Sequence, residues 1–99
     1  MREIMPYRTT AQADQDIIDI YLWGCREFGQ PQAERYHAGL AAALDLIAEN
    51  PRIARERHEF TPAVRLHPYQ SHMIVYLLDD MGVLVVRVLH GRQDWESCL

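Results

Sequence analysis

The sequence predicts a small α+β fold in which an N-terminal strand and an antiparallel α-helical hairpin pack on a small antiparallel β-sheet. Apolar residues recur at helical spacing over residues 13–47, with one break near the middle. Residues 64–90 then form short runs rich in branched aliphatic side chains, which favour strands. Helices followed by a strand meander indicate an α+β arrangement. Ninety-nine residues suit one core, so we expect residues 1–99 to form a single domain.

The first strand is expected from Ile4 to Arg8, and the proline inside it favours an edge position or an irregular strand. Thr9 and Thr10 are good helix starters, and Thr9 with Gln12 fits a capping box. The first helix then ends at Gly29. Its apolar stripe, which we expect to face the core, consists of Ala13, Ile17, Ile20, Tyr21, Gly24 and Phe28.

The second helix is expected to begin at Pro31, because proline suits a first helical position. Asn50 and Pro51 end it, since the residue before a proline disfavours the helical conformation. Only about two residues separate the helices, which therefore form an antiparallel hairpin. The apolar stripe of the second helix consists of Ala33, Tyr36, Leu40, Ala43, Leu44 and Ile47.

A surface loop and three strands are expected in the second half of the chain. Residues 52–62 are charged and show no period, which predicts the loop. The tight turn at residues 79–82 contains a glycine that can adopt a positive φ. The strands of the meander are expected at Val64–Pro68, His72–Leu78 and Val83–His90.

Alternation assigns the side chains of these strands to two faces. In the first strand of the meander, we expect Val64 and Leu66 to point inward and Arg65 and His67 to point outward. The last strand is apolar on both faces, so it should lie in the middle of the sheet with both faces covered. One face would carry Val83, Val85, Arg87 and Leu89, and the other Leu84, Val86, Val88 and His90.

The charge balance argues against a nucleic-acid-binding protein. Fourteen acidic residues face ten basic residues, for a formal charge of −4, and every basic residue is arginine. Proteins that bind a phosphate backbone usually carry a basic face, so we expect no direct nucleic-acid binding by this chain alone. Arginine favours fixed, bidentate contacts with carboxylates.

No membrane segment, signal peptide or metal site is expected. The longest apolar run is far shorter than the roughly 20 residues of a membrane span. Residues 1–6 lack the apolar segment and cleavage site of a signal peptide, which predicts a cytoplasmic location. Cys25 and Cys98 show no metal-binding spacing and are expected to be free thiols.

Six segments together resemble the ParE toxins of bacterial toxin-antitoxin modules, within the wider RelE/ParE superfamily. The resemblance covers nearly the whole chain, and its specificity lies in the order and spacing of the segments. These are residues 13–21 leading to Phe28-Gly29, Ala33-Glu34-Arg35-Tyr36 with Leu40, residues 47–52, Val64-Arg65, residues 72–76 and residues 86–94.

The resemblance implies a RelE/ParE-like fold and the toxin component of a type II toxin-antitoxin module. ParE toxins are associated with poisoning DNA gyrase, so inhibition of DNA gyrase, arrest of replication and growth, and plasmid stabilisation are the expected activities. A ParD-like antitoxin would neutralise the toxin by direct binding, and no cofactor is implied. RelE-type relatives cut messenger RNA in the ribosome, which is the alternative function. Loss of toxicity is a third possibility.

The nuclease alternative is less well supported by the residues present. A metal-free ribonuclease needs a base, an acid and cations for the developing charge, and His67, His72, His90, Arg65 and Arg87 are the available candidates. RelE-type enzymes rely on lysines of the exposed sheet, which this chain lacks. We therefore assign no catalytic residue and expect the protein to act by binding. Structural ion pairs or antitoxin carboxylates are the expected partners of the two arginines.

Binding surfaces are predicted more clearly. Ile18, Leu22 and Cys25 widen the apolar arc of the first helix to about 200°, more than one sheet face requires. The second helix would cover part of this excess, and a partner peptide laid along the hairpin groove would cover the rest. Trp23 points away from both surfaces, which predicts an interface anchor. We therefore expect antitoxin contacts at Ile18, Leu22, Trp23, Cys25, Arg65 and Arg87.

The end of the last strand and the tail are the expected contacts with the target. The face of the last strand with Val83, Val85 and Leu89 needs a cover, which the antitoxin or the tail through Trp95 would supply. Target contacts are expected at His90, Arg92 and Trp95.

Overall fold

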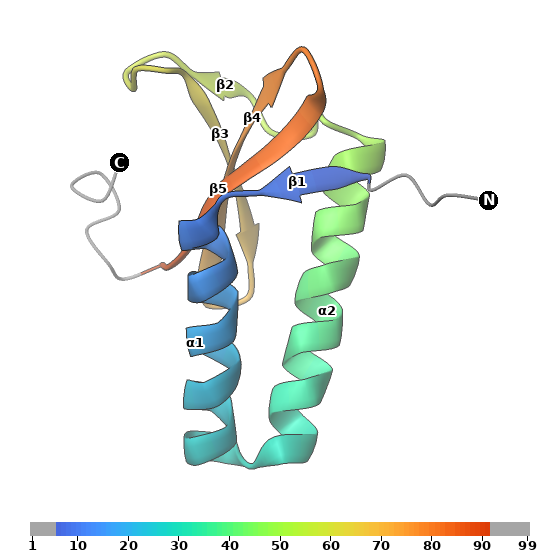
Figure 1. Ribbon diagram of the computed structural model, residues 1–99, viewed down its shortest axis with the longest axis vertical. Helices are drawn as coiled ribbons and strands as arrows, with labels where there is room; N and C mark the ends of the chain where they lie inside the picture. Colours follow the sequence, from blue (N-terminus) through green and yellow to red (C-terminus); the bar gives the residue numbers. More distant parts are fainter. Residues whose placement is uncertain (1–5, 92–99) are drawn as a thin grey trace.

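The structure is a computed structural model of the chain, and it describes residues 6–91. It has the predicted α+β fold, with a helical hairpin packed against a five-stranded sheet (Figure 1). The elements are β1 (Tyr7–Thr9), α1 (Ala11–Phe28), α2 (Gln30–Glu49), β2 (Glu56–Arg57), β3 (Val64–Tyr69), β4 (His72–Asp79) and β5 (Gly82–His90).

The sheet has the strand order β1-β5-β4-β3-β2. The meander β3-β4-β5 is antiparallel as predicted, but β1 pairs with β5 in parallel, so the sheet as a whole is mixed. The predicted edge position of the first strand is confirmed, and its described part begins at Tyr7. The loop predicted at residues 52–62 contains the two-residue edge strand β2. β5 is internal, as its two apolar faces predicted.

α1 begins one residue later than the predicted capping box implied. The Oγ1 atom of Thr10 accepts a hydrogen bond from the backbone N–H of Ala13 at 3.0 Å, so Thr10 rather than Thr9 is the cap. The hydroxyl of Thr9 donates to the carboxylate of Asp14 instead. α1 ends at Gly29 as predicted, where a φ of 89° suits glycine. This residue alone joins the two helices, which forces the tight hairpin.

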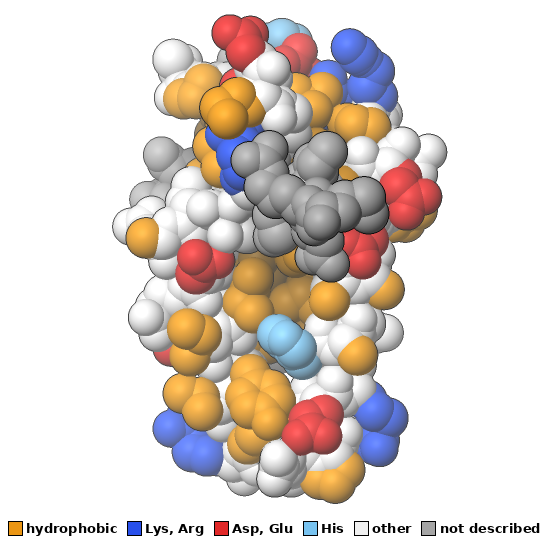
Figure 2. Space-filling view, turned by 45° about the vertical axis from the view of Figure 1, so that its right-hand side comes forward, with side chains coloured by type: hydrophobic (Ala, Val, Ile, Leu, Met, Phe, Trp, Pro, Cys, Tyr) orange, Lys and Arg blue, Asp and Glu red, His pale blue; other side chains and the backbone are white. Residues whose placement is uncertain are grey.

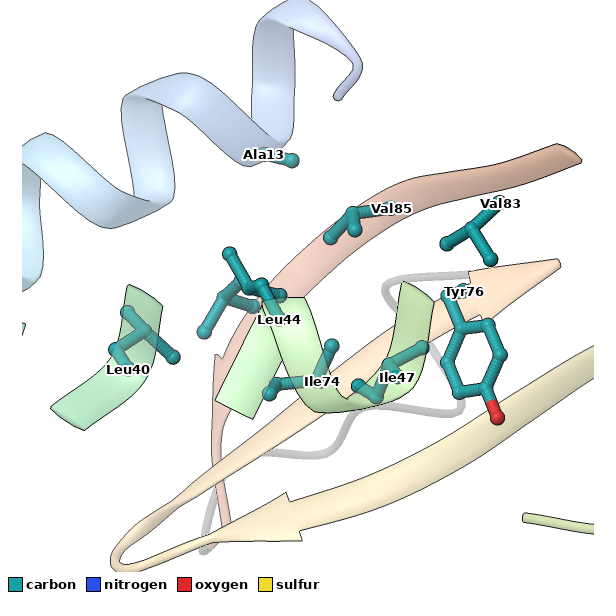
Figure 3. Close-up of a cluster of buried hydrophobic side chains, with 9 residues drawn as sticks. Ala13, Leu40, Leu44, Ile47, Ile74, Tyr76, Val83 and Val85 are labelled. Atoms are coloured by element: carbon teal, nitrogen blue, oxygen red, sulfur yellow. The ribbon is translucent and has the colours of Figure 1, made fainter. Parts of the chain in front are cut away.

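The main core lies between the helices and the sheet. The predicted stripe of α2 is confirmed, because Ala33, Leu40, Leu44 and Ile47 are buried. In α1 the stripe is correct except at its end, where Phe28 is 56% exposed. Figure 3 shows Leu40, Leu44 and Ile47 of α2 among the strand side chains that complete the core, which include Ile74, Tyr76, Val83 and Val85.

A β-bulge in β5 overturns the predicted faces of the end of this strand. Val75 lies opposite Arg87 and Tyr76 lies opposite Val85, so Val86 is an extra residue in β5. One inserted residue reverses the alternation that follows it. The residues of β5 in the helix-facing core are therefore Val83, Val85 and Val88, whereas Leu89 joins Val64 and Val75 in a second cluster on the other face. The prediction that Val83, Val85 and Leu89 share one face that a partner or the tail must cover is wrong, because Val83 and Val85 are buried in the core beneath the helices.

The side-chain directions predicted for β3 are also wrong with respect to the helices. Val64 belongs to the second cluster, away from the hairpin, and Leu66 packs against it. Arg65 and His67 lie opposite Tyr76 and Ile74, two residues of the helix-facing core. Directly opposed residues share a face, so the polar side chains of β3 lie on the helix side. The sheet has an apolar cluster on each face, which alternation within one short strand does not reveal.

The helical hairpin is longer than the part of the sheet that covers it. In Figure 1 the ends of α1 and α2 that meet at Gly29 extend well beyond the turn between β3 and β4. Side chains on the inner sides of these helix ends therefore have no strand to pack against. This overhang positions the candidate site.

Candidate functional site

A cavity of about 230 Å³ lies where the two helices leave the end of the sheet. A second hollow beside it shares four of its lining residues, Ile20, Trp23, His72 and His90. We call the two together the hairpin groove. α1 contributes Ile20 and Trp23, α2 contributes Tyr36 and Leu40, and the ends of β4 and β5 contribute His72 and His90.

Small residues bring the helices together beside the groove, and aromatic residues surround it. A Cβ atom built on Gly24 would lie 3.4 Å from the Cβ of Ala33, so the helices are in contact there. Tyr21 of α1 packs edge to face on His37 of α2, with ring centroids 5.9 Å apart. Figure 2 shows hydrophobic side chains gathered in the hollow between the two helices, with a histidine over it. The surface is therefore hollowed and largely apolar.

Polar groups in the wall of the groove are paired with one another. The hydroxyl of Tyr36 lies 2.6 Å from Nδ1 of His72, and the rings of His72 and His90 pack edge to face with centroids 5.3 Å apart. Burial, and secondarily the nearby His90, lowers the pKa of His72, while burial raises the pKa of Tyr36. The Tyr36 hydroxyl and the His72 imidazole are therefore paired with each other in their uncharged forms. This wall presents ring surfaces rather than unsatisfied donors.

Arg87 is held inside the chain by Asp16 of α1. Nε and Nη2 of Arg87 donate to the two carboxylate oxygens of Asp16 at 2.8 and 3.0 Å, and the backbone N–H of Val88 donates to the same carboxylate at 3.0 Å. The backbone N–H of Thr10 donates to the carbonyl of Val85. β1 pairs with β5 only as far as Val85, and beyond this residue the start of α1 lies along the edge of β5. Arg87 was expected to form either a structural ion pair or a contact with carboxylates of the antitoxin, and the structure contains the ion pair.

The other predicted arginine, Arg65, also has a partner within the chain. Its Nη1 atom donates to the backbone carbonyl of Ala54 at 2.6 Å, just beyond the end of α2. The aliphatic part of Arg65 lies beside Tyr76, whose own hydroxyl donates to the carbonyl of Pro51. Arg65 therefore links the loop after α2 to the sheet, and it is not among the residues that line the groove. Its expected contact with an antitoxin remains a prediction.

The exposed apolar residues predicted on α1 form two surfaces rather than one. Ile18, Leu22 and Trp23 are each about half exposed, and Cys25 is partly buried. Successive residues of a helix are about 100° apart, so Leu22 and Trp23 face different directions. The sequence suggested that Trp23 points away from the other apolar surfaces, and this prediction is wrong. It lines the groove and packs on Phe28, with ring centroids 5.5 Å apart.

Of the three predicted target contacts, one lies within the described residues. His90 is exposed and lines the groove, whereas Arg92 and Trp95 lie outside the described residues. Sequence reasoning did not include Phe28, Tyr36 or His72 among the site residues. Both aromatic residues had been assigned to the core stripes of their helices, and the only signal for the groove was the surplus of large apolar residues on α1.

The part of the chain that the structure describes offers neither a cluster of metal ligands nor a membrane-spanning helix. Within residues 6–91, no three His, Cys, Asp or Glu side chains gather closely enough to hold a metal ion. Neither α1 nor α2 combines the length and the apolar character that crossing a membrane requires.

Comparison with known proteins relates the chain to bacterial toxins. The model of a family described as "ParE toxin of type II toxin-antitoxin system, parDE" matches residues 7–95. Toxin ParE1 of Mycobacterium tuberculosis is 41% identical over 76 residues, which cover 74% of this chain and 78% of the relative. Toxin ParE of Escherichia coli is 33% identical over 90 residues, which cover 89% of this chain and 86% of the relative.

A solved structure has the same fold at low sequence identity. It is a chain from the "Chromosomal ParDE TA system from P. aeruginosa", with a TM-score of 0.75 and 15% identity. The match covers 87% of this chain and 95% of that chain. At this identity the likeness concerns the arrangement of the hairpin and the sheet.

Proposed function

The chain belongs to the ParE toxin family of type II toxin-antitoxin systems, and from this premise we propose that it inhibits DNA gyrase until a ParD-like antitoxin binds it. The antitoxin covers the apolar surfaces of the hairpin. The toxin binds gyrase once the antitoxin has released these surfaces. The protein acts in the bacterial cytoplasm, by contact with another protein rather than by its own catalysis. Stabilisation of a plasmid that carries the gene pair follows from this arrangement.

The observation that carries the proposal is the amount of large apolar surface that the hairpin leaves exposed. Ile18, Leu22, Trp23 and Phe28 of α1 are each 48–56% exposed. Isolated apolar side chains on a surface are ordinary, but several on one helix beside an apolar hollow are typical of a protein-binding surface. An amphipathic segment in a groove between helices is a common way of burying such a surface.

The arrangement of the basic residues favours binding over messenger RNA cleavage. Arg87 lines the same hollow as His72 and His90 but is bound by Asp16, and Arg65 donates to the backbone carbonyl of Ala54. A ribonuclease would need a cation close to its base and acid to stabilise the developing charge. The guanidinium groups of both candidate cations are already bonded within the chain, Arg87 to Asp16 and Arg65 to Ala54.

Induction of the chain in bacteria without its antitoxin tests the target. We expect growth arrest, induction of the DNA-damage response and intact translated messages. With purified proteins, the toxin should inhibit supercoiling by gyrase or accumulate cleaved DNA, and it should leave relaxation by topoisomerase I unchanged. Cleavage sites in translated messages without a DNA-damage response would instead establish the endonuclease, and growth at the normal rate would mean that toxicity has been lost.

Substitutions on the two surfaces of α1 test where the antitoxin binds. Trp23→Ala removes the groove residue, and Ile18→Asp with Leu22→Asp changes the second surface. We expect each change to weaken antitoxin binding by at least about 30-fold, the effect of losing a contact worth 2 kcal/mol. Met81→Asp is a matched control, because Met81 is 77% exposed in the turn between β4 and β5. Unchanged dissociation constants for both sets would exclude the hairpin as the antitoxin site.

A further inference from the structure

The flank of α1 that borders the hairpin groove carries acidic residues on both sides of Trp23. Asp19 precedes Trp23 by four residues and Glu27 follows it by four, so all three lie along one line of the helix, with about 12 Å between the two acidic positions. Asp19 and Trp23 both line the groove. Asp19 accepts a hydrogen bond from Gln15, and both acidic side chains are exposed.

These two carboxylates keep their charge available to a partner. None of the four ion pairs found within residues 6–91 includes Asp19 or Glu27. Asp16, on the same flank, differs because Arg87 neutralises it. The helices around the groove are acidic as a whole, since α1 and α2 contain seven acidic residues and two arginines, a formal charge of −5.

We propose that the hairpin groove receives one bulky apolar side chain from an amphipathic segment of the antitoxin, and that lysine or arginine residues of this segment pair with Asp19 and Glu27. The proposal rests on the proposed function, which supplies the antitoxin, and it adds the chemistry by which the antitoxin is recognised. It also assigns the ion-pairing role to acidic residues of the toxin rather than to Arg65 and Arg87.

The size and lining of the cavity fit a single large side chain. A cavity of roughly 150 Å³ accommodates benzene, so about 230 Å³ suits an aromatic ring or a large aliphatic side chain. His72 lines the cavity together with Trp23, and its Nδ1 atom is already bonded to Tyr36. An entering group therefore meets ring surfaces and needs no polar atom. Bulky side chains that enter desolvated pockets carry most of the binding energy of typical interfaces.

Charge distinguishes the antitoxin segment from a second copy of this chain. Two hairpins with a charge of −5 each would repel when their grooves face each other, whereas a basic segment is attracted. Opposite charges on the rim chiefly favour the right partner and the right register. The charge of the groove would thus disfavour binding of a second copy of this chain. It would favour a basic, amphipathic helix whose two cationic side chains are about two turns apart.

The test uses the full chain and the antitoxin encoded beside it, purified separately and titrated by calorimetry at low ionic strength. The charge variant is Asp19→Asn with Glu27→Gln. Its matched control is Asp45→Asn with Glu49→Gln, which removes two exposed charges from the far end of α2. We expect the charge variant to bind about 5- to 10-fold more weakly, as two exposed ion pairs allow, and the control to bind like the original chain.

Each outcome has one meaning. Failure of the original chain to bind the antitoxin would contradict the proposed function itself. Normal binding by the charge variant, or equal weakening in the control, would overturn the present inference and leave the proposed function standing. A chain ending at Gly91 separates another occupant: if its loss of residues 92–99 tightens antitoxin binding, the tail occupies the groove and the inference is wrong. Self-association through the groove, detected as a dimer that Trp23→Ala abolishes, would also overturn it.

Discussion

Asp16 stabilises two elements with one side chain. Its carboxylate holds the guanidinium of Arg87 and also accepts the backbone N–H of Val88, at a point of β5 that β1 no longer reaches. Both side chains of the pair are more than four-fifths buried. A charge in this position needs its partner, because an unpaired ion loses the hydration that it has in the unfolded chain. Asp16 therefore belongs to the fold rather than to the binding surface.

Asp16→Ala should lower the free energy of unfolding by about 3 kcal/mol, because it removes the carboxylate that accepts hydrogen bonds from both the largely buried guanidinium of Arg87 and the N–H of Val88. Urea denaturation measures the change. In the background of Arg87→Met, the same substitution should cost much less, since no buried charge is left behind. Asp19→Ala, on the exposed part of the same helix, is the comparison. A loss at Asp16 no larger than the loss at Asp19 would refute the structural role.

His72 should make the stability of the protein sensitive to acid. Burial lowers its pKa in the folded state, so below pH of about 6.5 the unfolded chain binds a proton that the folded chain resists. Stability due to His72 is therefore present above this pH and is lost as the pH falls towards the lowered pKa. His72→Asn keeps a polar side chain that can hydrogen-bond the Tyr36 hydroxyl, and it cannot titrate. Denaturation at pH 7.5 and 5.5 should show a smaller decrease in stability for the variant; an equal decrease would assign the effect to other groups.

The helices were easier to predict than the sheet, for a physical reason. Helical stripes repeat every three to four residues along one element, and caps are local, so the ends at Gly29 and Asn50 could be read from neighbouring residues. The faces of β5 depended on its neighbours. Branched aliphatic side chains occupy nearly every position of this strand, so both registers bury a similar set, and alternation could not reveal the extra residue at Val86.

Deletion of Val86 tests the importance of the bulge at the scale of this element. It would restore simple alternation and exchange the faces of Val88 and Leu89, which are now buried in different clusters. Because burial of each such side chain contributes about 1.5–3 kcal/mol, the deletion should remove most of the 5–15 kcal/mol that stabilises a typical domain. Val86→Ala, which keeps the register, should cost about 1 kcal/mol. Thermal unfolding compares the two, and a deletion variant as stable as the substitution would show that the register is not specified by packing.

The groove could not be located from the sequence because it exists only in the assembled molecule. Trp23, Tyr36, His72 and His90 come from four elements, and they meet where the hairpin extends past the end of the sheet. The periodicity of α1 correctly indicated more apolar surface than one sheet face buries. It could not show that Trp23 would line a cavity while Leu22 faced solvent, because that depends on where α2 crosses α1.

The separation of charge over the whole molecule predicts how fast the antitoxin associates. The hairpin carries a formal charge of −5, although the complete chain carries only −4, so an approaching basic segment is drawn towards the groove. The association rate constant, measured by stopped-flow tryptophan fluorescence, should fall at least about 10-fold between 50 and 500 mM salt, since the screening length shrinks to a few ångströms over this range. Asp19→Asn with Glu27→Gln should flatten this dependence, and Asp45→Asn with Glu49→Gln should flatten it less. A rate that rises with salt would mean that the approaching segment is acidic, and the charges of the hairpin would then act against the complex rather than for it.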